Sequence, residues 1–156
     1  HKLRDDEDND FHVANMAEMV EAAQSVTGVF TLLLSAVAAI SLVVGGIGIM
    51  NIMLVTVTER TREIGIRKAI GAKDRDILVQ FLLEAIVMST LGGLIGILAG
   101  VSTAKAGTMI TGFPTVVSSV SIALALTFSL SVGIFFGFYP ARRAAAMDPV
   151  EALSYE

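Results

Sequence analysis

Few side chains in this sequence are placed to do chemistry, and the most conspicuous is one acid inside an apolar segment. Glu84 is the only charged residue between Asp76 and Lys105, and it lies about two helical turns after Asp76. Ionisable groups at membrane depth are costly, so they occur where function needs them, for example in proton or substrate paths. Near the membrane surface, such a group is instead satisfied by water or by a basic neighbour. We expect Glu84 to pair with a basic loop residue, with a proton or substrate path as the alternative.

The other candidates for chemistry have no partners at a useful spacing. His1 and His12 lack the companion ligands of a metal site, and no serine and histidine form a recognisable nucleophile arrangement. The glycine-rich runs do not match the phosphate-loop pattern G-x-x-x-x-G-K-[ST]. The chain has no cysteine, which excludes disulfides and thiolate metal sites. We therefore predict no catalytic residue, no metal site and no cofactor-binding residue in this chain.

The apolar content and its clustering indicate a membrane protein. Hydrophobic residues make up 54% of the chain and charged residues only 17%, which is unlike a soluble domain. No charged side chain occurs in residues 22–58, 85–104 or 106–141. A helix needs ~20 apolar residues to cross ~30 Å of hydrocarbon. The predicted fold is an all-α integral membrane protein, with transmembrane helices at residues 29–57, 77–104 and 115–139.

The charges outside these spans predict the orientation. Residues 1–28 hold seven acids and two basic residues, whereas residues 58–76 hold six lysines and arginines. Short loops rich in lysine and arginine stay on the cytoplasmic side, and acids count for little. We therefore place the loop 58–76 and the tail 140–156 in the cytoplasm. The stretch 1–28 and the short turn 105–114 are then outside.

The loop 58–76 has the pattern of a short helix at the membrane surface. Thr56 or Thr58 can cap its start, Gly71 suits its end, and a new helix starts at Asp74. The alternative is a basic linker held by lipid head groups.

Within this loop helix, Ile64, Ala69 and Ile70 are expected to share a face. Glu63 and Arg67 have the i, i+4 spacing at which opposite charges pair. Arg62, Glu63, Arg67 and Lys68 are expected on its exposed side.

The tail beyond the third span is also patterned. Pro140 is expected to end the span, because proline breaks the helical hydrogen-bond ladder. Asp148 and Pro149 then predict a second short helix, with the acid as its cap and the proline at its first position.

Glycines recur every four residues in two spans, which places them on one helix face each. Such faces let helices approach closely in lipid. The sequence leaves open whether they pack within the chain or form a seam between two protomers. The predicted packing residues are Gly92, Gly96, Gly100, Gly133 and Gly137.

Three stretches carry a resemblance to a known family. Residues 45–100, from GGIGIMNIMLVTVTERTREIGIRKAIGA to LGGLIGILAG, resemble the core signature of the MacB/FtsX-like family of ABC transporter permeases. The ending YPARRAAAMDPVEALSYE is similar to the family's closing motif. The opening DFHVANMAEMVEAAQSV is similar to the end of its extracytoplasmic domain. Residues 101–138 fit by hydrophobicity and placement only.

The resemblance implies the C-terminal part of a four-helix, MacB-type macrolide or peptide export permease. The first helix and most of the extracytoplasmic domain would precede His1, and residues 1–28 would end that domain and form a stalk. The loop helix at about residues 58–71 would be the coupling helix, seated on an ATP-binding cassette. The residues expected to contact the cassette are Glu59, Arg60, Arg62, Glu63, Arg67 and Lys68.

The family also implies the partners and the mechanism. ATP and Mg²⁺ would bind a fused or separate cassette, so this chain would not itself be an enzyme. The expected partners are that cassette, a second permease protomer in a homodimer, a periplasmic or extracellular adaptor and membrane lipid, with no nucleic acid. Cassette closure would move the long helices and reshape the extracytoplasmic domains, which is mechanotransmission in a bacterial inner or plasma membrane.

Four functions compete on this basis. The first is export of antibiotics, peptides or other amphiphiles, which the match of TERTREIGIRKAIGA to the MacB branch favours. The second is a cell-division transducer that activates a cell-wall hydrolase, and the third is lipoprotein release. The fourth is a passive anchor for an outer domain.

Overall fold

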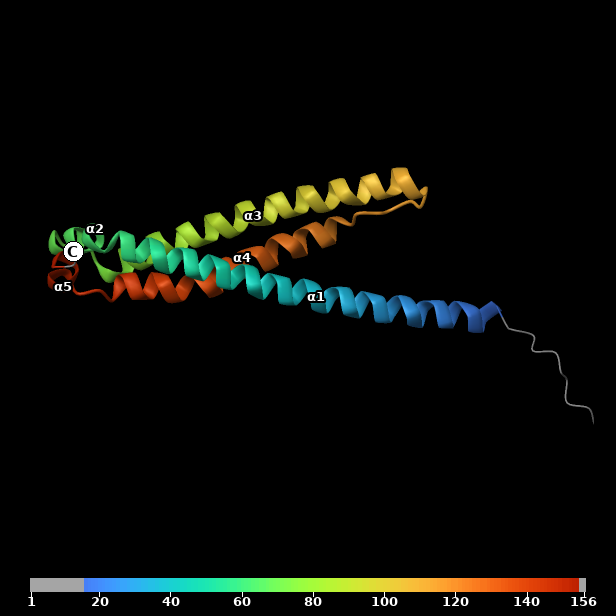
Figure 1. Ribbon diagram of the computed structural model, residues 1–156, viewed down its shortest axis with the longest axis horizontal. Helices are drawn as coiled ribbons and strands as arrows, with labels where there is room; N and C mark the ends of the chain where they lie inside the picture. Colours follow the sequence, from blue (N-terminus) through green and yellow to red (C-terminus); the bar gives the residue numbers. More distant parts are fainter. Residues whose placement is uncertain (1–15, 155–156) are drawn as a thin grey trace, which may run out of the picture. The chain divides into compact units, whose positions relative to one another are not determined.

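The computed structural model describes residues 16–154 and is helical, with no strand among those residues. His1, His12 and five acids of the opening stretch lie outside the described residues: Asp5, Asp6, Glu7, Asp8 and Asp10. The helices in chain order are α1 (Met16–Glu59), α2 (Thr61–Ala69), α3 (Asp74–Thr111), α4 (Ser119–Ala145) and α5 (Pro149–Leu153) (Figure 1). Three of them, α1, α3 and α4, are long and apolar enough to cross a membrane. The predicted all-α integral membrane fold with three spans is confirmed.

The described chain falls into two units, which divide α1 between Ser41 and Leu42. In the first unit the described side chains of α1 are exposed throughout, although most of them are apolar. The hydroxyls of Thr27, Thr31 and Ser35 donate to carbonyls four residues earlier, at 2.7–2.8 Å. Polar groups satisfied within their own helix are compatible with a hydrocarbon surrounding. This stretch therefore suits contact with lipid or with another chain.

In the second unit, α3 and α4 lie side by side over much of their length (Figure 1). Small residues make this approach possible, because Gly133 and Gly137 of α4 lie directly against Ser89 and Ala85 of α3. The hydroxyl of Ser129 donates to the carbonyl of Ser89 across the same contact, at 2.5 Å. Small residues and interhelical hydrogen bonds are the usual basis of packing in lipid.

The core of the second unit lies where the short helices meet the long ones. Phe81, Met53, Ile64, Ile77 and Val57 are its largest fully buried apolar side chains. Alanines at the end of α4 complete the same cluster: Ala141, Ala144 and Ala145.

These alanines follow Pro140, and α4 continues through that proline to Ala145. The expectation that Pro140 ends the helix is therefore wrong. Proline removes one N–H from the ladder, but its ring is fully buried and the next turn packs into the core. Burial of that turn outweighs the missing hydrogen bond.

The end of α3 also differs from the predicted limits. Residues 105–111, expected in an external turn, continue the helix to Thr111. The connection to α4 occupies residues 112–118. Gly112 ends α3 with a φ of 73°, a left-handed conformation that glycine adopts without strain. Ser118 then caps α4, because its side chain accepts a hydrogen bond from the N–H of Val120.

Candidate functional site

The loop between α1 and α3 forms the predicted short helix, α2. Thr56 and Thr58 do not cap it, because α1 continues to Glu59 and their hydroxyls donate to the carbonyls of Ile52 and Leu54. A hydroxyl inside a helix has a carbonyl four residues back within reach, so it is not free to cap the next helix.

At the other end of α2, Gly71 has a φ of 104°, and its N–H donates to the carbonyl of Lys68 at 3.0 Å. The expected glycine stop is confirmed there.

The buried face of α2 differs from the expected one. Ile64 is 2% exposed and belongs to the core, whereas Ile70 is 81% exposed and Ala69 is exposed as well. Residues five and six positions apart point in different directions on a helix, so these three cannot share a face. Thr61 and Gly65 are buried beside Ile64 instead.

A network of ion pairs joins α2 to α3. Arg60 donates to both carboxylate oxygens of Glu63, at 2.9 and 3.2 Å, and to Glu84 of α3 at 3.1 Å. Arg67 donates to Glu63, one turn earlier in α2, and to the amide oxygen of Gln80 in α3. The expected pairing of Glu63 with Arg67, and of Glu84 with a basic loop residue, is confirmed.

These pairs shift the titration of the two loop residues. The hydrogen bond from Arg60 lowers the pKa of Glu63 below its usual value, and the same bond raises the pKa of Arg60. The guanidinium of Arg60 also lies 5.7 Å from the ring centroid of Phe81, within the range of a cation–π contact. Arg60 is thus held by two carboxylates and one aromatic ring.

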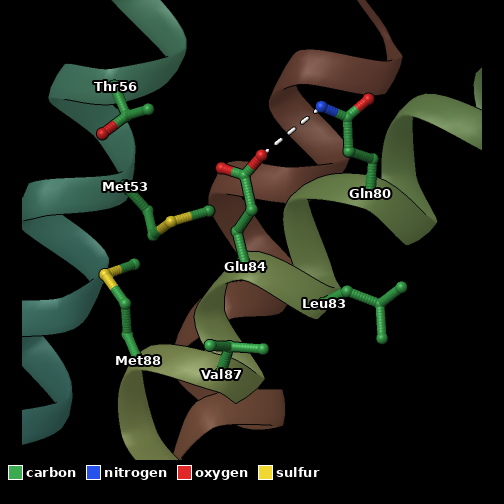
Figure 2. A pocket seen from close by; sticks show the side chains of 7 residues that line it. All are labelled: Met53, Thr56, Gln80, Leu83, Glu84, Val87 and Met88. Carbon is green, nitrogen blue, oxygen red and sulfur yellow. Dashed lines mark hydrogen bonds between the residues drawn. The ribbon is translucent and has the colours of Figure 1, made fainter. Parts of the chain in front are cut away.

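Glu84 lies at the edge of an open groove of about 530 Å³ between α1 and α3. Figure 2 shows Met53 of α1 and Met88 of α3 converging on this groove, with the amide of Gln80 donating to the carboxylate at 3.4 Å. Its remaining lining is Thr56, Leu83 and Val87. Because Glu84 already has two partners, its pairing accounts for an acid at this position.

Lys68 is the most buried of the charged residues of α2. Its side chain is 9% exposed, and its ammonium contacts the carboxylate of Asp74 at 2.9 Å. It also donates to the carbonyls of Ala145, the last residue of α4, and of Met147, two residues further on. Its expected place on the exposed side of α2 is therefore wrong.

The helix α5 packs against the other side of α2. Asp148 caps α5 by accepting a hydrogen bond from the N–H of Val150 at 2.8 Å, with Pro149 at the first position, as predicted. The buried methyl of Ala152 lies against the backbone of Gly65, where an added Cβ would come within 2.8 Å of it. Gly65 therefore allows α5 to pack closely on α2.

The six residues expected to contact a cassette fall into two groups. Glu59 and Arg62 are exposed. The other four are half-buried and paired within the chain: Arg60, Glu63, Arg67 and Lys68. Gln80 and Gly65 were not predicted to belong to this region, and no spacing in the sequence links them to it.

The glycines divide in a similar way. Gly133 and Gly137 lie against α3, whereas an added Cβ at Gly92, Gly96 or Gly100 would meet nothing within 4 Å. The glycine of α3 that faces α4 is Gly93, which lies against Ser129. Packing by the other three stays a prediction.

Together these contacts make the end of the second unit one connected block. The helix α2 is tied to α3 by ion pairs, to α4 by Lys68 and to α5 by close packing. The exposed charges Glu59, at the end of α1, and Arg62, in the first turn of α2, lie on either side of Arg60. In such a block, a displacement of α2 is transmitted to α3 and α4 through these contacts. The described side chains of the block include no nucleophile with an adjacent base.

Comparison with known proteins places this arrangement in a family. The model of the FtsX-like permease C-terminal family matches residues 35–149. The chain is 56% identical over 146 residues to the macrolide export ATP-binding/permease protein MacB of Bdellovibrio bacteriovorus, covering 94% of this chain and 22% of that protein. It is 51% identical over 156 residues to the MacB protein of Syntrophobacter fumaroxidans, covering 100% of this chain and 22% of that protein.

A third relative is an uncharacterized permease. The chain is 47% identical over 149 residues to the uncharacterized ABC transporter permease YknZ of Bacillus subtilis, covering 96% of this chain and 38% of that protein. The chain therefore spans only about a fifth to two fifths of the length of these relatives. The resemblance stated from the sequence is confirmed: the chain is a multi-pass membrane protein that belongs to the FtsX-like permease C-terminal family.

Proposed function

We propose that this chain is the C-terminal membrane part of an ABC-type export permease, and that α2 is the helix through which an ATP-binding cassette drives it. The observation that carries the proposal is the attachment of α2. Arg60, at its N-cap, and three charged residues within it bind α3, the end of α4 or one another, while Glu59 and Arg62, on either side of the N-cap, are left exposed. If α2 only contacted lipid head groups, its charged side chains would not need to form ion pairs with α3.

The proposed mechanism is mechanotransmission. Closure of the cassette displaces α2, and the ion pairs to Glu84 and Asp74 pass the displacement to α3 while Lys68 passes it to α4. The long helices then move the extracytoplasmic part of the transporter. Most polar side chains of the spans bond within their own helix, so a polar path between these helices is not required.

The partners follow from the same proposal. ATP and Mg²⁺ bind the cassette, which leaves this chain without a catalytic role. The cytoplasmic side holds α2 and α5, as the basic loop indicates. A second protomer covers exposed apolar faces of the spans, and a periplasmic or extracellular adaptor receives the cargo. Because two of the relatives are named macrolide exporters, the proposed cargo is an antibiotic, a peptide or a similar amphiphile.

The test uses the full-length parent protein, purified from membranes in mild detergent. Mass spectrometry shows whether a cassette is fused or bound, and an ATPase assay shows whether it is active. We expect Arg62→Glu to reduce ATP hydrolysis and retention of a separate cassette, because it reverses an exposed charge without breaking an internal pair. Lys105→Glu is the matched control, since Lys105 is exposed far along α3, and it should retain both.

Absence of any cassette, or full activity in Arg62→Glu, would overturn the assignment. The passive-anchor alternative predicts no ATPase at all. The cell-division alternative predicts ATPase activity together with binding of a cell-wall hydrolase rather than resistance to amphiphiles. Drug susceptibility of cells expressing the wild-type and Arg62→Glu transporters separates that alternative from export.

A further inference from the structure

The ammonium of Lys68 brings three helices together. It contacts the carbonyls of Ala145 and Met147, the latter at 2.8 Å, and the carboxylate of Asp74 at 2.9 Å. A lysine ammonium has three N–H donors, and here each has an acceptor of its own. With only 9% of its side chain exposed, this lysine is more buried than charged residues usually are.

Two of the three acceptors lie at helix ends, and the third, the carbonyl of Met147, lies just beyond α4. Ala145 is the last residue of α4, and the final carbonyls of a helix have no N–H partner and carry partial negative charge. Asp74 is the first residue of α3, where a carboxylate is favoured by the opposite end of the dipole. One ammonium therefore closes the carboxyl end of α4 and the amino end of α3 around the last turn of α2.

We infer that Lys68 is a positioning residue: it fixes α2 against the ends of α3 and α4, so that a movement of α2 reaches both membrane helices. This inference rests on the proposed role of α2 as the coupling helix. Arginine cannot take its place, because a planar guanidinium does not direct donors to three acceptors around one nitrogen. Methionine has a similar length and no donor, so it leaves two carbonyls and one carboxylate without their partner.

The contact itself is tested by distance measurements in the full-length protein. This chain has no cysteine, so spin labels are introduced at the exposed positions Ala69 and Arg142 after any cysteine elsewhere is replaced. We expect a narrow distance distribution in the wild type and a broad one in Lys68→Met. Asp74→Asn weakens only one of the three contacts at an exposed residue, so it should broaden the distribution less. Lys73→Met, at a neighbouring exposed lysine, should leave it narrow.

The positioning role is tested by ATP hydrolysis and chemical rescue. Lys68→Met should lower kcat and leave KM for ATP unchanged, because the nucleotide site lies on the cassette. In Lys68→Cys with no other cysteine, alkylation by 2-bromoethylamine restores an ammonium and should restore kcat, whereas iodoacetamide adds a neutral group and should not.

The outcomes separate the two proposals. A narrow distribution in Lys68→Met, an unchanged kcat in that variant, or equal rescue by both reagents overturns the role of Lys68. A wild-type protein without any cassette activity overturns the proposed function and the coupling role with it. The distance measurement needs no ATP, so a broad distribution in Lys68→Met would then still show that the contact holds α2.

Discussion

Arg60 donates to Glu84 at 3.1 Å, which ties the start of α2 to a residue 24 positions further along the chain, in α3. The same guanidinium holds Glu63 within α2. Side chains of the pair are about one third exposed, at 33% and 35%. The pair is therefore neither a free surface contact nor a fully desolvated one. Its energy should resemble that of other partly exposed ion pairs.

The first prediction concerns this pair. Arg60→Met and Glu84→Gln should each destabilise the full-length protein, and their coupling in a double-mutant cycle should be about 0.5–1 kcal/mol. Thermal unfolding in detergent measures the four proteins of the cycle. Strictly additive effects would contradict a direct interaction. If Glu84 served a proton path instead, Glu84→Gln would abolish ATP-driven export without lowering the unfolding temperature.

The second prediction is a pH dependence that follows from Glu63. The hydrogen bond from Arg60 lowers its pKa from the usual 4.5, so the folded state favours the ionised carboxylate. The stabilisation is therefore fully present above about pH 4.5 and is lost as the pH falls through the lowered folded pKa.

The measurement compares unfolding temperatures of the wild type and Glu63→Gln between about pH 7 and pH 3. The two should differ at neutral pH and converge at the acidic end. The other carboxylates are common to both proteins, so they cancel in this comparison. A difference that grew on acidification would have the wrong sign. Added salt should reduce the neutral-pH difference, because more than a third of the Glu63 side chain is exposed.

The sequence predicts the fold well because the membrane imposes simple rules. Long charge-free stretches predict the three spans, and Asp148 followed by Pro149 predicts α5, because both signals are local in the sequence. Contacts between distant residues could not be predicted in the same way. Lys68 reaches carbonyls 77 and 79 residues away, and backbone acceptors carry no signature in residue type.

Two further differences have the same origin. A four-residue glycine repeat indicates a helix face but not which segment packs on it. Without the position of α4, the sequence cannot show that Gly93, rather than Gly92, lies against α4. Pro140 disfavours a helix locally, and only the burial of the following alanines explains why α4 continues. In both cases tertiary packing, rather than local preference, decides the structure.

The third prediction concerns docking of α5 on α2. Gly65→Val would place a branched side chain where even one Cβ comes within 2.8 Å of Ala152, so α5 must shift. We expect faster proteolysis of the tail in the full-length protein, with the membrane spans intact. Gly71→Ala is not a suitable control, because its positive φ adds strain. Ala146→Val, at an exposed position after α4, is the better control and should leave the tail protected.

The fourth prediction separates packing within a protomer from packing between protomers. An added methyl at Gly133 would overlap the side chain of Ser89 and come within 3.2 Å of the carbonyl oxygen of Ala85. Backbone cannot yield as a flexible side chain can, so Gly133→Ala should destabilise the protein by about 1–3 kcal/mol. Gly96 has open space around it, so Gly96→Ala should not lower the unfolding temperature of a monomer in detergent.

Gly96→Leu extends this prediction to the protomer interface. If the face of Gly92, Gly96 and Gly100 packs against a second copy, the larger side chain should lower the fraction of dimer measured by light scattering or crosslinking in lipid discs. The unfolding temperature of the monomer should stay the same, because an added Cβ at Gly96 meets no atom of the second unit within 4 Å. Loss of monomer stability would instead place a segment of the same polypeptide on this face. An unchanged dimer fraction would show that lipid covers these glycines, because lipid chains adapt to an added side chain and a packed helix does not.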